Sequence, residues 1–120
     1  MLVTHIYLKG QCKEAIDLYV KAFNATIETI IHDTEQEELI IHAEILIHNQ
    51  LLMLNDNNDG LSESGGYQLS VRFDSENELK SAYSVFKDDS NVILPMQATD
   101  YSSCVVRFVD KFDVRWAFWV

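Results

Sequence analysis

Apolar and polar residues alternate along the first half of the chain in short runs, interrupted by one segment with a longer period. A period of two is typical of a half-buried strand, whereas apolar residues three and four positions apart predict an amphipathic helix. Residues 13–23 have the helical spacing, and their apolar face consists of Ala15, Ile16, Tyr19, Val20 and Phe23. The expected strands are residues 3–8, 26–32, 39–47 and 51–54, with a solvated acidic turn at 33–38 and a tight turn at Asn49-Gln50.

The second half repeats this order. Residues 75–86 predict a helix in which Ser75 is the N-cap and Glu78 follows at capping-box spacing. The expected strands are residues 67–73, 91–95 (closed by the single proline), a long strand region from about 97 to 109, and 114–120. Both halves therefore follow the order β-α-β-β-β, and the pattern Glu14…Tyr19 recurs as Glu78…Tyr83, 64 residues later. We expect one α+β domain, 1–120, with module one at about 1–56, a linker at about 57–66 and module two at about 67–120.

The composition limits the possible binding partners more than it limits the possible folds. The 120 residues carry a net charge of −10, from 19 acidic and 9 basic side chains. Such a surface repels phosphate backbones and anionic lipids, so we expect no nucleic-acid and no membrane partner. Cys12 and Cys104 stand outside any metal-binding motif, and the N-terminal residues lack the basic and apolar regions of a signal peptide. We therefore expect a cytoplasmic protein with reduced thiols.

Strand alternation also predicts which side chains face away from the helices. In residues 39–47 the core side is expected to hold Ile41, Ala43, Ile45 and Ile47. His42 and Glu44 then share the opposite side. The same reasoning gives the other strands these outward residues: His5, Tyr7 and Lys9; Gln68, Ser70 and Arg72; Arg115, Ala117 and Trp119.

The His42–Glu44 pair has three interpretations. It can be a hydrogen-bonded pair on the wet side of a strand, or two ligands of a metal ion that His5 completes. It can also be a catalytic acid–base pair without metal, in which His42 is the better base because its ordinary pKa lies near neutrality. We expect His48 to be exposed at the hairpin turn and His32 to pair with the acidic turn.

The three arginines, Arg72, Arg107 and Arg115, all fall in predicted strands of the second half. One interpretation is that they pair with acids such as Glu44. The other is a cationic wall for a small anionic ligand, because guanidinium groups bind carboxylates and phosphates through two parallel hydrogen bonds. The aromatic side chains that could border such a ligand are Tyr7, Trp119 and Tyr101.

Four stretches of the sequence point to a family: KGQCKEAIDLYVKAFNA, HAEILIHNQLLMLND, GGYQLSVRF and VDKFDVRW. They resemble PhnB-like proteins of the glyoxalase/bleomycin-resistance/extradiol-dioxygenase superfamily, also called vicinal oxygen chelate proteins. The last stretch stands where the family usually has D-P-F-G-x-R-W, with Lys111 and Asp113 replacing the Pro and the Gly. The resemblance implies two βαβββ modules whose curled mixed sheets form a cup, often in a homodimer. In metal-using members, strand residues facing the cup hold a divalent cation.

Carried onto this sequence, the family's ligand positions are His5 (or Thr4 beside it), Gln68, Met53 and Ala117. A methionine sulfur is a soft ligand and alanine has no donor, so the shell for a hard cation is incomplete. We expect no metal cofactor, with His5, His42, Glu44 and Gln68 as the weak candidates for one divalent ion. The expected function is binding of a small molecule, for which the arginines suggest an anion. The expected ligand-binding residues are His5, Tyr7, Gln68, Arg72, Arg115 and Trp119. The alternative is a metal-dependent lyase, isomerase or dioxygenase.

Overall fold

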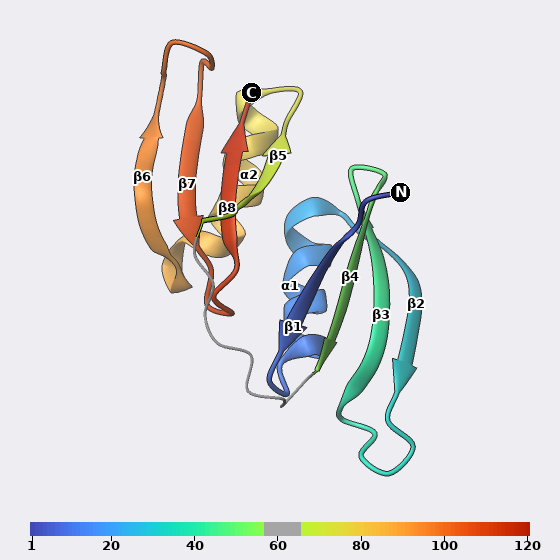
Figure 1. Ribbon diagram of the computed structural model, residues 1–120. Coiled ribbons are helices and arrows are strands. Elements are labelled where there is room, and N and C mark those ends of the chain that lie inside the picture. The colour runs from blue at the N-terminus through green and yellow to red at the C-terminus, as the bar shows by residue number, and fades with distance from the viewer. Residues whose placement is uncertain (57–65) are drawn as a thin grey trace. The chain divides into compact units, whose positions relative to one another are not determined.

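The computed structural model describes residues 1–56 and 66–120, and its contacts divide the chain into two compact units, Met1–Ser62 and Glu63–Val120. Each unit is a four-stranded mixed sheet with a helix against one face (Figure 1). The predicted order β-α-β-β-β is therefore confirmed in both halves. The predicted linker at 57–66 lies, except for Gly66, outside the described residues.

The elements of unit 1 are β1 (Thr4–Leu8), α1 (Cys12–Phe23), β2 (Thr26–His32), β3 (Ile40–Ile47) and β4 (Gln50–Asp56). Those of unit 2 are β5 (Leu69–Arg72), α2 (Glu76–Phe86), a short 3-10 turn (Lys87–Asp89), β6 (Asn91–Gln97), β7 (Val105–Val109) and β8 (Arg115–Trp119). The strand orders are β1-β4-β3-β2 and β5-β8-β7-β6. In each sheet the first strand runs parallel to the last, and the other pairs are antiparallel. The two halves thus share one topology.

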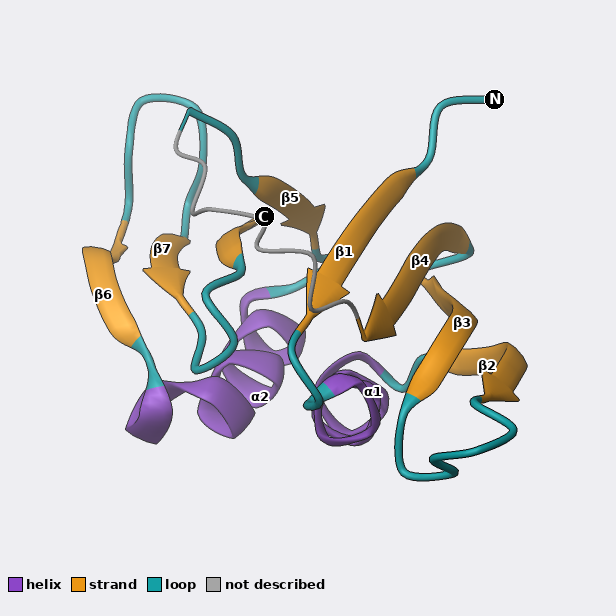
Figure 2. Ribbon diagram, turned by 60° about the horizontal axis from the view of Figure 1, so that its bottom comes forward, coloured by secondary structure: helices purple, strands orange, loops and turns teal. Residues whose placement is uncertain are grey.

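Each helix buries its apolar side on its own sheet (Figure 2). In α1 the predicted face is confirmed: Ala15, Ile16 and Tyr19 are at most 1% exposed. The N-cap prediction for α2 is also confirmed, because the Ser75 hydroxyl accepts a hydrogen bond from the Glu78 amide at 3.2 Å. Sequence patterning therefore placed both helices within one residue of their bounds.

The hairpin between β3 and β4 turns one residue earlier than predicted. His48 and Asn49 form the turn, with φ angles of 49° and 64°, and Gln50 already pairs with Ile47. Two consecutive positive φ angles are those of a type I′ turn, whose twist matches that of the flanking strands. Asn49-Gln50 is therefore wrong as the turn, and β4 is longer than the predicted 51–54.

A β-bulge overturns one prediction about the faces of β3. Ile41 is 51% exposed, whereas its neighbour Ile40 is fully buried. The pairing with β2 shifts here, because His42 lies opposite Ile31 while Ile40 lies opposite His32. Ile41 is the extra residue, and an extra residue inverts the alternation of a strand. The other predicted core residues of this strand stay buried.

Three strand predictions in unit 2 are wrong in their bounds, the first because β5 covers only Leu69–Arg72 of the predicted 67–73. β6 does not end at Pro95 but continues to Gln97, which is possible because β6 is an edge strand whose outer side needs no backbone donor. The long strand region predicted from 97 to 109 is a strand only over β7. Before it, the chain turns at Thr99, whose amide bonds to the Ser102 carbonyl at 2.8 Å.

A buried carboxylate organises the turn between β7 and β8. Asp110 is 3% exposed. Its Oδ1 accepts hydrogen bonds from the amides of Phe112 at 2.8 Å and Val114 at 3.0 Å, and its Oδ2 accepts one from the Trp116 indole at 2.9 Å. The stretch VDKFDVRW is therefore a structural element that holds the last hairpin.

Candidate functional site

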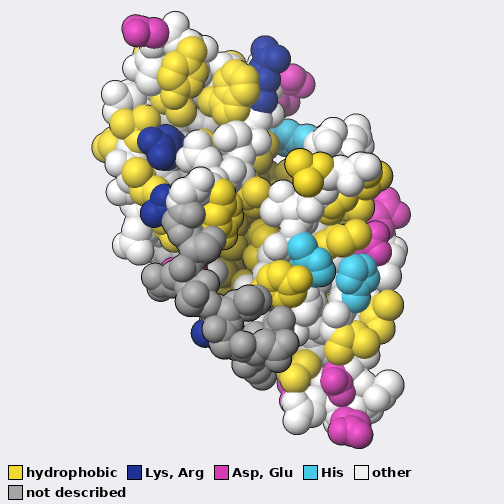
Figure 3. Space-filling model, viewed as in Figure 1, with side chains coloured by type: hydrophobic (Ala, Val, Ile, Leu, Met, Phe, Trp, Pro, Cys, Tyr) yellow, Lys and Arg dark blue, Asp and Glu magenta, His cyan; other side chains and the backbone are white. Residues whose placement is uncertain are grey.

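The face of the first sheet that is turned away from α1 carries a compact group of polar side chains. Strand register sets this group, because directly opposed residues of neighbouring strands share a face. His5 lies opposite Met53, and Met53 lies opposite Glu44. Two residues further along β1 and β4, Tyr7 lies opposite Asn55. This polar face of unit 1 shows two neighbouring histidine side chains beside hydrophobic ones in the space-filling view (Figure 3).

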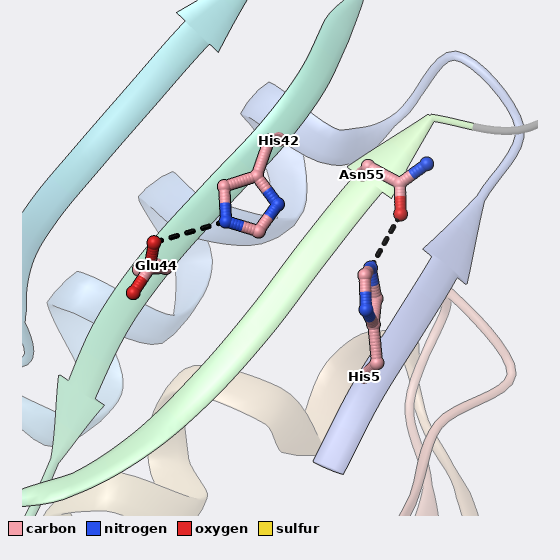
Figure 4. Close-up of polar contacts among 4 residues, drawn as sticks. All are labelled: His5, His42, Glu44 and Asn55. Carbon is pink, nitrogen blue, oxygen red and sulfur yellow. Dashed lines mark hydrogen bonds and ion pairs between the residues drawn. The ribbon is translucent and has the colours of Figure 1, made fainter. Parts of the chain in front are cut away.

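The predicted pair on β3 is in direct contact. The His42 Nε2 atom lies 2.9 Å from the Glu44 Oε2 atom, and the two side chains are 31% and 29% exposed (Figure 4). A carboxylate only accepts, so the imidazole donates through Nε2. This geometry leaves the His42 Nδ1 atom as the free position of the ring.

His5 lies on the same face, but its hydrogen-bond partner is Asn55. Its Nε2 atom lies 2.6 Å from the Asn55 Oδ1 atom, and its ring stacks on Tyr7 with centroids 4.6 Å apart and planes at 5°. The His5 and His42 rings approach edge to face, with centroids 6.2 Å apart. The imidazoles of His5 and His42, which were predicted to converge, are therefore neighbours. Glu44 contacts His42 through a hydrogen bond.

Asn55 and Asp56 were not found by sequence reasoning. Asn55 alternates with Met53 on β4 and so shares the face of His5, a signal that the strand pattern contained. Asp56 has a structural role: its carboxylate accepts from the Cys12 amide at 3.0 Å and the Ile40 amide at 2.9 Å. It thereby caps α1, whose own N-cap residue, Gln11, makes no side-chain cap.

The second sheet carries a different chemistry on the face turned away from α2. Arg107 lies opposite Ala117, Arg115 lies opposite Val109, and Arg72 lies opposite Trp119. Because positions 115, 117 and 119 alternate along β8, all three arginines share one face. We call this the arginine face. None of the strands β5–β8 contains Asp or Glu. Figure 3 shows basic side chains over the strands of this unit.

Two of the arginines are oriented by neighbours on that face. The Arg72 guanidinium lies 5.5 Å from the centre of the Trp119 ring, a cation–π distance. The Arg107 Nε donates to the Gln68 amide oxygen at 3.1 Å. Arg115 is half-buried. Glu44, one of the acids suggested as partners for these arginines, is bonded to His42.

The remaining predicted residues lie away from both faces or contribute little to them. His48 is exposed in the hairpin turn, as expected. The His32 Nδ1 atom lies 2.7 Å from the Glu37 carbonyl oxygen, so its partner in the acidic turn is the backbone. Tyr101 is 67% exposed in the loop between β6 and β7.

The thiols are poor nucleophiles. Cys12 is fully buried and Cys104 is 4% exposed. Burial, with a smaller contribution from the Asp56 carboxylate, raises the pKa of Cys12 to about 12, and burial also raises the pKa of Cys104. Neither thiol is positioned for covalent chemistry.

The donor set does not fit a hard divalent cation at the family's positions. Met53 stands between His5 and Glu44, and Ala117 is 5% exposed with Ser70 opposite it. Gln68 precedes β5 and is bonded to Arg107. Within residues 1–56 and 66–120, no three His, Cys, Asp or Glu side chains converge as a metal site would require. No helix in this part of the chain is long and apolar enough to cross a membrane.

The model of the Glyoxalase/Bleomycin resistance protein/Dioxygenase superfamily matches residues 3–118. No curated protein matches the chain. Among solved structures, the PhnB protein from Bacillus cereus is 22% identical, with 98% of this chain and 97% of that chain covered and a TM-score of 0.88. A protein from Pseudomonas aeruginosa is 23% identical, with coverage of 99% and 96% and a TM-score of 0.86. The fosfomycin resistance protein FosX from Listeria monocytogenes is 12% identical, with coverage of 99% and 90% and a TM-score of 0.75. The structural likenesses agree with the family match, and the chain belongs to the glyoxalase/bleomycin resistance protein/dioxygenase superfamily.

Proposed function

We propose that this protein binds a small anionic molecule through the arginine face of unit 2 and does so without the superfamily's metal. One observation carries the proposal: a chain with a net charge of −10 places all three of its arginines on one face of one sheet whose strands contain no acid. Guanidinium groups gathered on one face bind carboxylate or phosphate oxygens through charge-assisted hydrogen bonds, so this face is suited to an anionic ligand.

The neighbours of the arginines favour a ligand with both an anionic and an apolar part. Trp119 is half-buried and offers a ring beside Arg72, as small-molecule sites typically do. Gln68 restrains Arg107, which reduces the side-chain entropy lost when a ligand binds. The short side chains of Ser70 and Ala117 lie between these larger groups in the sheet.

The alternative is a metal-dependent lyase, isomerase or dioxygenase. Such a site usually needs three protein ligands or more with an open position. Met53 and Ala117 occupy two of the four positions and offer no oxygen or nitrogen donor. A metal-free catalytic role for His42, with Glu44 orienting it, fits the 2.9 Å bond between them and stays the second candidate function.

A panel of small anions tests the binding proposal by calorimetry and thermal shift. The FosX structure contains Mn(II) and 1S,2S-dihydroxypropylphosphonic acid, so a small phosphonate belongs in the panel beside carboxylates and phosphate esters. Arg115→Gln should weaken the binding of the tightest-binding anion by about 1–3 kcal/mol, the usual contribution of a hydrogen bond to a charged group. Lys21→Gln removes the same charge from the last turn of α1 and serves as the matched control. Equal affinity in wild type and Arg115→Gln would exclude that arginine from the site.

We also infer a homodimer. Exposed apolar side chains lie on one edge strand of each sheet: Ile27 and Ile31 on β2 are 46% and 45% exposed, and Val92 and Ile93 on β6 are 48% and 43% exposed. Unpaired edges with such side chains favour association. Light scattering during size-exclusion chromatography measures the mass directly, and a mass of 13.8 kDa at micromolar concentration contradicts the inference.

A further inference from the structure

The two histidines on the polar face of unit 1 are both held in the same tautomer. The Asn55 Nδ2 atom donates to the Asp56 carbonyl at 3.0 Å, which turns its Oδ1 atom toward His5. An amide oxygen only accepts, so the His5 Nε2 atom carries the proton. The carboxylate of Glu44 imposes the same state on His42. In both neutral rings the lone pair therefore sits on Nδ1.

The two rings that carry these lone pairs are close neighbours. Among the described residues, neither Nδ1 atom has a hydrogen-bond partner. In Figure 4, the His42 nitrogen that is not bonded to Glu44 is turned toward the side where His5 and Asn55 lie. A metal–nitrogen bond of about 2 Å places the ion about 3 Å from a ring centre. The His5 and His42 centroids are 6.2 Å apart with the ring planes at 68°, so one ion can be shared once the His5 ring turns its Nδ1 atom toward His42.

The arrangement around the rings is that of metal-binding histidines. Such a histidine normally donates its second nitrogen to a carboxylate or carbonyl oxygen, which fixes the ring and raises its basicity. Glu44 provides this partner for His42, and the Asn55 side-chain oxygen provides it for His5. Stacking on Tyr7 restrains the His5 ring further. Each imidazole therefore has the oxygen partner that a metal-binding histidine normally has.

The third donor selects the kind of ion. Met53 lies directly opposite His5 and, because it faces Glu44, one diagonal step from His42. Diagonal neighbours have Cα atoms about 7–8 Å apart, within reach of long side chains. A thioether binds soft cations and disfavours Mg²⁺ or Mn²⁺. We propose that His5, His42 and Met53 form a site for a soft monovalent cation, Cu(I) or Ag(I). This site is independent of the anion proposed for unit 2.

Anaerobic titration with Cu(I) against a chromogenic chelator tests the site on untagged full-length protein. We expect one equivalent of Cu(I) per chain. His42→Gln should weaken binding at least tenfold, and Met53→Leu, which keeps a similar volume, at least threefold. His32→Gln is the matched control, because His32 is exposed and bonded to the backbone of the acidic turn, and it should leave the affinity within twofold.

Two results would overturn the proposal. One is a wild-type protein that fails to retain one equivalent of Cu(I). The other is unchanged binding in the double variant His5→Gln/His42→Gln, which would assign the ion to the thiols. A second measurement does not depend on the variants folding: two-dimensional ¹⁵N NMR of the wild type must show His5 and His42 as Nε2–H tautomers in the neutral state. Nδ1–H tautomers would remove the premise.

Discussion

The Asp110 carboxylate provides the most direct test of the structural role of the stretch VDKFDVRW. It is 3% exposed and accepts three hydrogen bonds, from the Phe112 and Val114 amides and the Trp116 indole. Asp110→Ala removes the acceptor of all three hydrogen bonds at once. Unsatisfied buried donors each cost about 1–3 kcal/mol, and relief from burying a charge offsets part of that sum. We expect a loss of about 3–5 kcal/mol in the free energy of unfolding.

A milder variant keeps the prediction measurable if Asp110→Ala fails to fold. Asp110→Asn retains an oxygen for the backbone amides but turns an NH₂ group toward the Trp116 indole N–H, so two donors then face each other. We expect a cost of about 2 kcal/mol. Adding Trp116→Phe removes the opposing indole donor, so the double variant should lose less than the sum of the two single ones.

Urea unfolding monitored by circular dichroism measures each variant, because the signal does not depend on the tryptophan replaced. Asp113→Asn is the matched control: it makes the same chemical change three residues away, at an exposed side chain. Its φ of 65° suits asparagine as well as aspartate. We expect the control to change stability by less than about 0.5 kcal/mol. If Asp110→Asn falls within that range too, the carboxylate does not hold the turn.

Three further predictions concern stability. Asp113→Gly should raise the midpoint of thermal unfolding by a few degrees, because glycine adopts the positive φ of 65° without strain; a lower midpoint contradicts this. Ser75→Ala should cost about 1 kcal/mol by uncapping α2, whereas Ser81→Ala at an exposed position of the same helix should be nearly neutral, both measured by urea unfolding. Because burial raises the pKa of Cys12 from 9.0 to about 12, the folded thiol stays protonated where the unfolded one ionises, so stability should fall as pH rises above about 9. Cys12→Ala should lessen that fall, and identical pH profiles would exclude this contribution.

Periodicity in the sequence was sufficient to predict the order of elements and most buried faces. It failed where pairing between strands decides the outcome. The bulge at Ile41 follows from the register of β3 against β2, which no local pattern contains. The turn at His48 and Asn49 depends on both residues adopting positive φ, which is uncommon for residues other than glycine.

The same division holds for the candidate site. His42 and Glu44 lie two residues apart on one strand, so their shared face could be predicted from alternation alone. The bond between His5 and Asn55 joins positions 50 residues apart, and only the parallel register of β1 and β4 brings them together. The structural role of Asp110 could not be predicted for a related reason: its hydrogen-bond partners are set by the folded turn and not by residue type.

The two sheets share one topology yet present different chemistry, and Met53 and Ala117, at two of the family's ligand positions, explain part of this difference. Ala117 lies opposite Arg107 on the arginine face. A glutamate there would place a negative charge beside that guanidinium and compete with any anionic ligand. Met53, on the corresponding strand of unit 1, lies beside His5 and Glu44, where a second carboxylate would repel the first. Without a carboxylate at either position, unit 2 presents a cationic surface and unit 1 a group of imidazoles beside a soft thioether. Each sheet is then suited to a separate ligand, which is why the anion and the soft cation are proposed as independent sites.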